Sequence, residues 1–174
     1  MKRLILLRHA KTELWNEGVS DRDRKLVARG HKDAEAIGDE LKARGWVPDA
    51  ALVSTARRTR ETWRHLHDFF PGCEATLSDA LYLASVPTIL DLVTLAAPKV
   101  STLLVVGHNP GMHEAALSIL QKAGTSDDMA ARKLSEKLPT GTAVLFESEE
   151  DEAFTPVHFR MMGWIRPKSL RARM

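Results

Sequence analysis

Two short, continuous apolar runs constrain the fold of this chain more than any other feature of its sequence. The first covers residues 4–7 (Leu-Ile-Leu-Leu) and the second covers residues 103–106 (Leu-Leu-Val-Val). Each run has the length of a strand and lacks alternating polar residues, which is typical of strands buried on both faces of a sheet. Such strands occur mainly in parallel sheets, because helices cover both sides of these sheets. The sequence therefore predicts an interior sheet between two layers of helices.

Segments with helical periodicity separate these runs from other strand-like segments. Residues 28–44 place Ala34, Ile37 and Leu41 on one helical face. The same reasoning predicts further helices over 55–69, from a cap at Ser85 onward and over about 112–123, and further strands at 50–53, 143–146 and 157–160. This alternation is typical of an α/β fold, here a three-layer α/β/α sandwich with a mainly parallel central sheet. Because no repeat or low-complexity linker interrupts the sequence, we expect one domain over residues 1–174.

The charge and cysteine content argue against several classes of protein. Lys and Arg total 25 against 23 Asp and Glu, giving a formal net charge of +2, whereas nucleic-acid binders usually carry a clear basic excess. The single cysteine, Cys73, can form neither an internal disulfide nor a cysteine-rich zinc site. No apolar stretch is long enough to span a bilayer, and the run at 4–7 is too short for a signal peptide. We therefore expect a cytoplasmic protein that binds neither nucleic acid nor a membrane.

Polar residues of one chemical kind follow three of the predicted strands. Arg8 and His9 follow the first strand, and His108 follows the strand that ends at Val106. The strand at 50–53 is followed by a serine and then by arginines at positions 57, 58 and 60. Ligands of such sheets bind beyond the C-terminal ends of the strands. We therefore expect two histidines and at least two arginines to meet in one crevice.

These residue types indicate an anion site with a nucleophile. Two guanidinium groups can each donate paired hydrogen bonds to phosphate oxygens, a task that arginine performs better than lysine. A neutral imidazole is a competent nucleophile, and nearby guanidinium groups disfavour its protonated form. No cluster of Asp, Glu and His has the spacing of a metal site. The sequence therefore predicts a metal-free anion site with an available histidine nucleophile.

Three short motifs at these strand ends resemble those of the histidine phosphatase superfamily, the phosphoglycerate-mutase-like proteins. Residues 8–12 (Arg-His-Ala-Lys-Thr) are similar to its Arg-His-Gly/Ala signature, residues 54–62 to its second motif and residues 107–110 to its third. The register of the second motif selects Arg58 rather than Arg57. Other segments resemble the short SixA-type phosphohistidine phosphatase branch, so the resemblance covers nearly the whole chain; these segments are 21–30, 139–141 and 166–170.

The resemblance implies a phosphoglycerate-mutase-like fold and a covalent mechanism. His9 would attack phosphorus and become a phosphohistidine, which water would then hydrolyse. Arg8 and Arg58 would bind the phosphoryl oxygens, and His108 would hydrogen-bond the same group and help to neutralise it. The resemblance implies no cofactor and no metal, because the two arginines and the second histidine supply the positive charge.

The general acid is the main departure from the larger members of this family. Those members carry a glutamate after the second helix, whereas the comparable residues 81–84 here read Leu-Tyr-Leu-Ala. A missing acid suits phosphohistidine, because its P–N bond is labile and its imidazole leaves readily once protonated. Asp21 and Glu13 are the candidates for an alternative proton donor.

Three functions stay open at this point. The resemblance favours a phosphatase that acts on phosphohistidine in a protein, such as a histidine phosphotransfer domain of a signalling relay. The second function is a metal-independent phosphatase for a small phosphorylated metabolite, such as a sugar phosphate or a nucleotide. The third is a non-catalytic phosphate-binding module, against which the four intact motif residues argue. The oligomeric state stays open as well.

Overall fold

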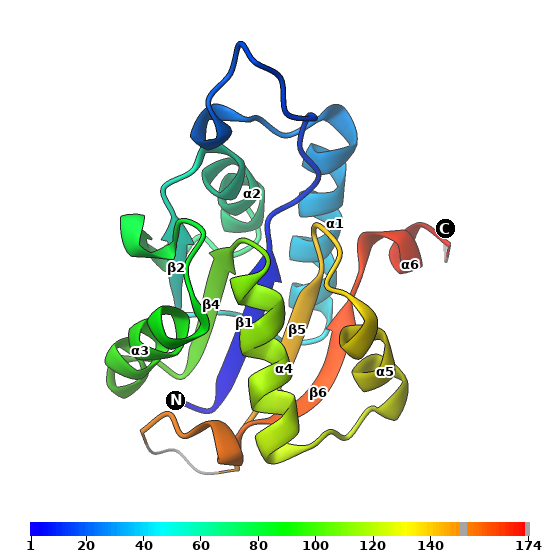
Figure 1. Cartoon of the computed structure of the whole chain (residues 1–174). Helices are drawn as coiled ribbons and strands as arrows, with labels where there is room; N and C mark the ends of the chain where they lie inside the picture. Colours follow the sequence, from blue (N-terminus) through cyan, green and yellow to red (C-terminus); the bar gives the residue numbers. More distant parts are fainter. Residues whose placement is uncertain (150–152, 173–174) are drawn as a thin grey trace.

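A six-stranded sheet forms the middle layer of the chain (Figure 1). The computed structural model describes residues 1–149 and 153–172. The strands lie in the order β3-β2-β4-β1-β5-β6, so β1 and β4 are in the middle. Their bounds are β1 Arg3–Arg8, β2 Ala50–Ser54, β3 Glu74–Ser78, β4 Thr102–Gly107, β5 Ala143–Glu147 and β6 Arg160–Ile165.

Five of the six strands point in the same direction. β1 pairs with β4, and β2 pairs with β4 and β3, all in parallel register. β5 runs antiparallel to both β1 and β6. The prediction of a mainly parallel sheet is therefore confirmed, with β5 as the reversed strand. The C-terminal ends of β1, β2 and β4 meet at one edge of the sheet.

Helices cover both faces of the sheet, which confirms the predicted three-layer α/β/α sandwich (Figure 1). The helices are α1 Ala28–Ala43, α2 Arg57–His67, α3 Val86–Ala96, α4 Gly111–Ala123, α5 Asp128–Glu136 and α6 Pro167–Arg171. α1 contacts α2 and α6, whereas α4 contacts α3 and α5. Within residues 1–149 and 153–172, no helix has the length and apolar character that crossing a membrane requires.

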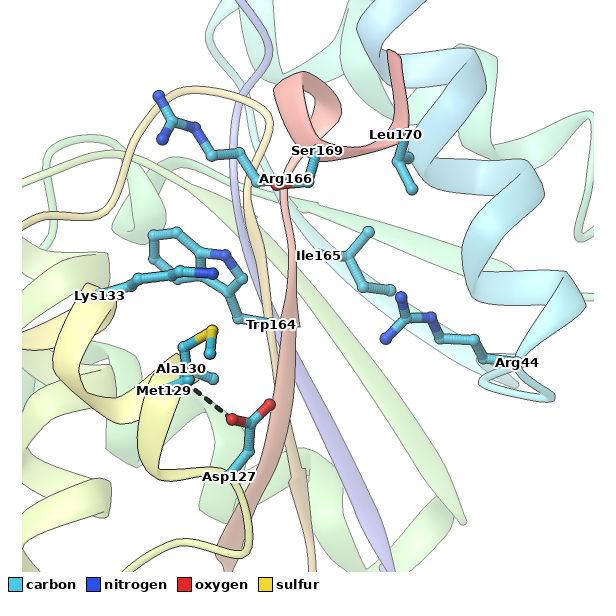
Figure 2. A pocket seen from close by; sticks show the side chains of 10 residues that line it. All are labelled: Arg44, Asp127, Met129, Ala130, Lys133, Trp164, Ile165, Arg166, Ser169 and Leu170. Atoms are coloured by element: carbon cyan, nitrogen blue, oxygen red, sulfur yellow. Dashed lines mark hydrogen bonds between the residues drawn. The ribbon is translucent and has the colours of Figure 1, made fainter. Parts of the chain in front are cut away.

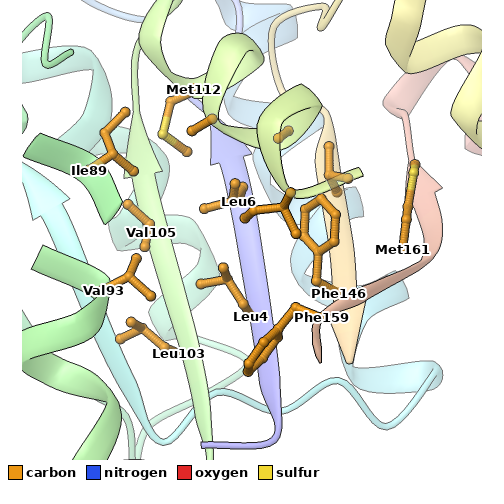
Figure 3. Close-up of a cluster of buried hydrophobic side chains, with 14 of the residues drawn as sticks. Leu4, Leu6, Ile89, Val93, Leu103, Val105, Met112, Phe146, Phe159 and Met161 are labelled. Carbon is orange, nitrogen blue, oxygen red and sulfur yellow. The ribbon is translucent and has the colours of Figure 1, made fainter. Parts of the chain in front are cut away.

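The side chains of β1 alternate between two apolar cores. Leu4 and Leu6 point into the core under α3 and α4, where Met112 and Phe146 also lie (Figure 3). Ile5 and Leu7 point into the opposite core, which contains Ile37, Leu41 and Leu66 of α1 and α2. All four β1 side chains are fully buried. This two-sided burial is the physical reason for the unbroken apolar run, because neither face of the strand contacts water.

The predicted strand at 157–160 is wrong in its position. Pro156–His158 form a 3-10 turn (η4), and the strand begins only at Arg160. Pro156 opens that turn, and the true strand shows the alternating burial of an edge strand rather than a continuous apolar run. The sequence analysis also missed β3, whose side chains are mostly exposed, and the short helices α5 and α6.

The start of α1 packs closely on the segment that follows β1. The N–H of Val27 donates a hydrogen bond of 3.0 Å to the carbonyl oxygen of Lys11. Gly30 lies in the next part of the helix, and a Cβ at this position would overlap the same carbonyl oxygen. The absence of a side chain at Gly30 therefore lets the helix approach the segment that carries Arg8 and His9.

We expect Gly30→Ala to lower the free energy of unfolding by about 1–3 kcal/mol, because an added methyl group must displace backbone rather than a flexible side chain. Urea denaturation followed by circular dichroism measures the change. Gly72→Ala is the matched control, since a Cβ at Gly72 meets nothing within 4 Å, and its effect should stay within about 0.5 kcal/mol. Equal effects of the two substitutions would contradict the packing argument.

Candidate active site

The backbone after β1 is held by two neighbouring segments. The N–H of His9 donates to the carbonyl oxygen of Gly107 at the end of β4 (3.1 Å). The N–H of Gly141, in the turn before β5, donates to the carbonyl oxygens of both Arg8 (3.0 Å) and His9 (2.9 Å). Gly141 has a φ of +69°, a conformation that glycine adopts without strain. The two residues are therefore fixed between the end of β4 and the start of β5.

The imidazole of His9 has one nitrogen committed to the backbone and one available. Its Nδ1 lies 2.8 Å from the carbonyl oxygen of Ala10, and a carbonyl only accepts, so Nδ1 carries the proton. Nε2 of the neutral ring then keeps its lone pair. Burial, followed by the nearby charges of His108, Arg58 and Arg8, lowers the pKa of His9 well below its usual value, against the opposing effect of the Ala10 hydrogen bond. His9 is therefore a neutral imidazole with a free Nε2, the form that a nucleophile needs.

The ring of His108 lies beside that of His9, with ring centroids 5.4 Å apart. Its Nε2 is 2.7 Å from Oγ of Ser54 at the end of β2, whose hydroxyl can donate to a neutral imidazole. With Ser54 as the donor, the proton of His108 lies on Nδ1. Burial, and then the charge of Arg58, lowers the pKa of His108 to about 3, so this ring is neutral at pH 7.

Two guanidinium groups complete the cluster. Nη1 and Nη2 of Arg58 donate to the main-chain oxygen (2.5 Å) and to Oδ2 (3.0 Å) of Asp21. Nη1 of Arg8 donates to the carbonyl oxygen of Leu138 (2.9 Å). Burial lowers the pKa of Arg8, and the charge of Arg58 lowers it further. The two cations are thus close enough to repel each other inside a mostly buried site, a condition that an anion would relieve.

Three buried donors at this site have no hydrogen-bond partner among residues 1–149 and 153–172. They are Nε of Arg8, Nε of Arg58 and, in the tautomer assigned above, Nδ1–H of His108. A buried donor without a partner costs free energy, so such groups usually mark a place where a ligand or water binds. The donors come from the ends of β1, β4 and the start of α2. A tetrahedral oxyanion such as phosphate has enough acceptor oxygens to satisfy all three.

The carboxyl group of Asp21 reaches the site but is held as an acceptor. It receives hydrogen bonds from Tyr82 Oη (2.6 Å), Arg24 Nη1 (3.0 Å) and Arg58 Nη2 (3.0 Å). Partial burial raises its pKa, but the hydrogen bonds from Tyr82, Arg24 and Arg58 outweigh this effect and hold the pKa well below its usual range. In this arrangement Asp21 has no proton to donate, which argues against its predicted role as a general acid.

Glu13, the other candidate proton donor, lies in the loop after β1. Its Oε1 accepts from the N–H of Lys25 (3.2 Å). In the part of the chain that the structure describes, no hydrogen bond joins Glu13 to His9, Arg58 or His108. The described residues also contain no group of three or more His, Cys, Asp or Glu side chains that could hold a metal ion.

Two residues that contact the cluster carried no predicted role. Tyr82 donates to Asp21, and its ring meets that of His108 edge-on, with centroids 5.5 Å apart. Thr62 on α2 donates to the carbonyl oxygen of Arg58 (2.7 Å) and accepts from the N–H of Ala10 (3.0 Å). Tyr82 is the single tyrosine of the chain and lies in residues 81–84, where larger family members carry a glutamate. The sequence signal for a role of Tyr82 was its position as a polar aromatic residue within an otherwise apolar segment.

Comparisons with known proteins agree with this geometry. Residues 4–82 match the family described as the histidine phosphatase superfamily, branch 1. An uncharacterized protein of Mycobacterium tuberculosis is 39% identical over 140 residues, which cover 80% of this chain and 85% of the relative. The chain is thus similar in sequence to that relative over most of both lengths.

Two solved structures share the fold along nearly the whole chain. One, from Agrobacterium tumefaciens and provisionally named phosphohistidine phosphatase SixA, is 30% identical with a TM-score of 0.80, covering 95% of this chain and 98% of its own. The other, from Nakamurella multipartitia and given the same provisional name, is 25% identical with a TM-score of 0.81, covering 95% and 96%.

The two buried histidines predict how stability depends on pH. Protonating either ring favours the unfolded chain, whose histidines titrate near 6.5, above the folded value of about 3 for His108. Their contribution is complete above pH 6.5 and is lost as the pH falls toward the folded values. The free energy of unfolding should fall by up to about 1.4 kcal/mol per pH unit for each histidine.

Urea denaturation between pH 7.5 and 4.5 measures this slope. In His108→Asn the slope should be shallower by about one histidine's share, because the substituted side chain binds no proton in this range. Equal slopes for the wild-type protein and the variant would contradict the depressed pKa of His108.

Proposed function

Since the chain belongs to branch 1 of the histidine phosphatase superfamily, a metal-independent family of phosphatases, we propose that its substrate is a phosphohistidine side chain of another protein. The observation that carries this proposal is the set of hydrogen bonds from Tyr82, Arg24 and Arg58, which hold the Asp21 carboxyl group as an acceptor. A phosphoester needs a proton on its departing oxygen. A phosphoimidazole protonated on its other ring nitrogen leaves as neutral imidazole without further help. The provisional names of the two similar structures favour the same substrate.

The first step transfers the phosphoryl group to His9. The Nε2 lone pair forms a new P–N bond, and the P–N bond of the substrate breaks with its electron pair returning to the departing imidazole. The unpartnered donors of Arg8, Arg58 and His108 bind the non-bridging oxygens, whose charge they stabilise through the transition state. The proton on Nδ1 of His9 stays on the hydrogen bond to Ala10.

The second step releases phosphate by the same electron flow. Water forms a bond to phosphorus, the P–Nε2 bond breaks, and the electron pair returns to Nε2 of His9. Because Nδ1 already carries a proton, the imidazole leaves as a neutral group. The proton that the water loses is taken up by phosphate or solvent. Neither step therefore requires a protonated carboxyl group on the enzyme.

The decisive assay follows phosphate release, in EDTA, from a phosphohistidine-loaded phosphotransfer domain beside a panel of small phosphoesters. We expect rapid release from the domain and slow or no release from the esters. His9→Ala should lower the rate by about 10³-fold or more, because it removes the nucleophile, while orthovanadate still binds through the arginines. Turnover of esters alone would favour a small-metabolite phosphatase and contradict the proposal. Vanadate binding without any turnover would indicate a binding module.

Neighbouring arginines provide a matched test of the phosphoryl contacts. Arg58→Ala should lower kcat by about 10²–10³-fold, because it removes a buried cation from the transition state. Arg57→Ala should change kcat by less than about twofold, since Arg57 is exposed and pairs with Glu61 on the helix surface (2.7 Å). The reverse order of effects would show that the second motif was assigned in the wrong register.

A further inference from the structure

A cationic cleft lies beside the active site, between α1, α6 and the turn that precedes β5. Its volume is about 520 Å³. Four of the residues that line it are basic and one is acidic, and the side chains used below are Arg29, Asp33, Arg166, Lys168 and Arg171. The cleft therefore carries an excess of positive charge, and α1 and α6 contribute most of its charged lining.

The one carboxylate of this cleft is already neutralised. Asp33 is 5% exposed, accepts a hydrogen bond from Arg171 and lies 3.9 Å from Nε of Arg29. Arg166 and Lys168 have no ion-pair partner among the described residues of the chain. Cations at a partly open surface gain from a complementary charge and are screened by salt. The unpaired positive charge of the cleft therefore favours a negatively charged ligand.

The turn before β5 joins this cleft to the nucleophile. Pro139 and Thr140 line the cleft, and the next residue, Gly141, donates its N–H to the carbonyl oxygen of His9. A Cβ at Gly141 would lie 3.1 Å from Cγ of Pro167 in the cleft wall and 3.8 Å from Cα of Ala10. The turn that lines the cleft is therefore the same turn that holds the backbone of His9.

The positive charge continues past Arg166 into a second cavity of about 230 Å³ (Figure 2). Arg166 lines both cavities, and Figure 2 shows its guanidinium directed away from Ile165 and Arg44. Lys133 of α5 also lines this second cavity, as do Arg44, which pairs with Glu40, and the carboxylate of Asp127. Two adjoining cavities that share one arginine form an extended strip, which suits a chain segment with several carboxylates better than a single small metabolite.

We propose that this strip binds an acidic segment of the phosphoprotein whose phosphohistidine enters the active site. The inference rests on the proposed function, because it names the surface that would recognise the same substrate. Carboxylates of the partner pair with Arg166 and Lys168, while its phosphoryl group reaches His9 on the other side of the Gly141 turn. Such charge pairing mainly raises the association rate and the specificity for the protein substrate.

The test is a double charge reversal, Arg166→Glu with Lys168→Glu, because neither side chain contacts the His9 cluster. The substrate is a phosphohistidine-loaded phosphotransfer domain with an acidic segment beside its histidine. We expect kcat/KM for this domain to fall about tenfold or more, mainly through KM, and the loss to shrink as salt screens the charges. Orthovanadate inhibition, and any turnover of a small phosphoester, should change by less than about twofold, since both report on the phosphoryl site alone.

Lys99→Glu with Lys122→Glu is the matched control. It makes the same change in net charge at two exposed lysines, Lys99 in the turn before β4 and Lys122 in the last turn of α4, neither of which lines the cleft. Poly-glutamate should inhibit turnover of the phosphodomain by the wild-type enzyme and by the control variant, but not by the cleft variant. Equal losses in both variants would overturn the proposal, because they would report only on net charge.

Other outcomes separate the docking surface from the proposed function. If the cleft variant turns over the phosphodomain as fast as the wild-type enzyme does, the docking surface is overturned and the proposed function stays intact. If the cleft variant also loses inhibition by vanadate, the docking surface is overturned as well. That result would mean that Arg166 and Lys168 act in the phosphoryl site or are needed for folding. No turnover of the phosphodomain by the wild-type enzyme would mean that the proposed function, and the inference with it, fails.

Discussion

The burial of two guanidinium groups next to two imidazoles is the constraint on which this site depends. Taking Arg8 and Arg58 out of water is costly, and placing them side by side adds repulsion. One ionised carboxylate, Asp21, balances part of this charge through Arg58. Burial, aided by the remaining positive potential, keeps both histidines neutral. Three donors of the cluster have no partner among the described residues and can bind an oxyanion. The nucleophilic form of His9 is therefore a consequence mainly of its burial, and the arginines around it add to the effect.

The parallel sheet explains why so much of the site could be predicted from local sequence. In the strand order β2-β4-β1, three neighbouring strands end at the same edge, so residues far apart in the chain converge there. Recognising each strand end was enough to bring Arg8, His9 and His108 together. The apolar runs at residues 4–7 and 103–106 also predicted the two helix layers, because a strand buried on both faces has apolar residues at every position. The edge strand β3 carries no such signal, because most of its side chains contact water.

The parts that sequence could not predict depend on contacts between distant segments. Only one partner of the Asp21 carboxyl group, Arg24, lies close to it in the sequence. Tyr82 comes 61 positions later and Arg58 37 positions later. Whether a carboxyl group is an acid or an anion depends on those partners and not on its own neighbours. The position of β6 was also predicted wrongly. β6 is an edge strand in which only alternate side chains are fully buried, so its sequence lacks a continuous apolar run.

The unpartnered donors around His9 also bear on how the reaction ends. They fit the oxygens of any tetrahedral dianion, so free orthophosphate, the product, competes for the same hydrogen bonds as the incoming phosphoryl group. When the product departs, water must replace phosphate on these donors. Throughput of such an enzyme is therefore coupled to the surrounding phosphate concentration, and dephosphorylation slows when phosphate is abundant.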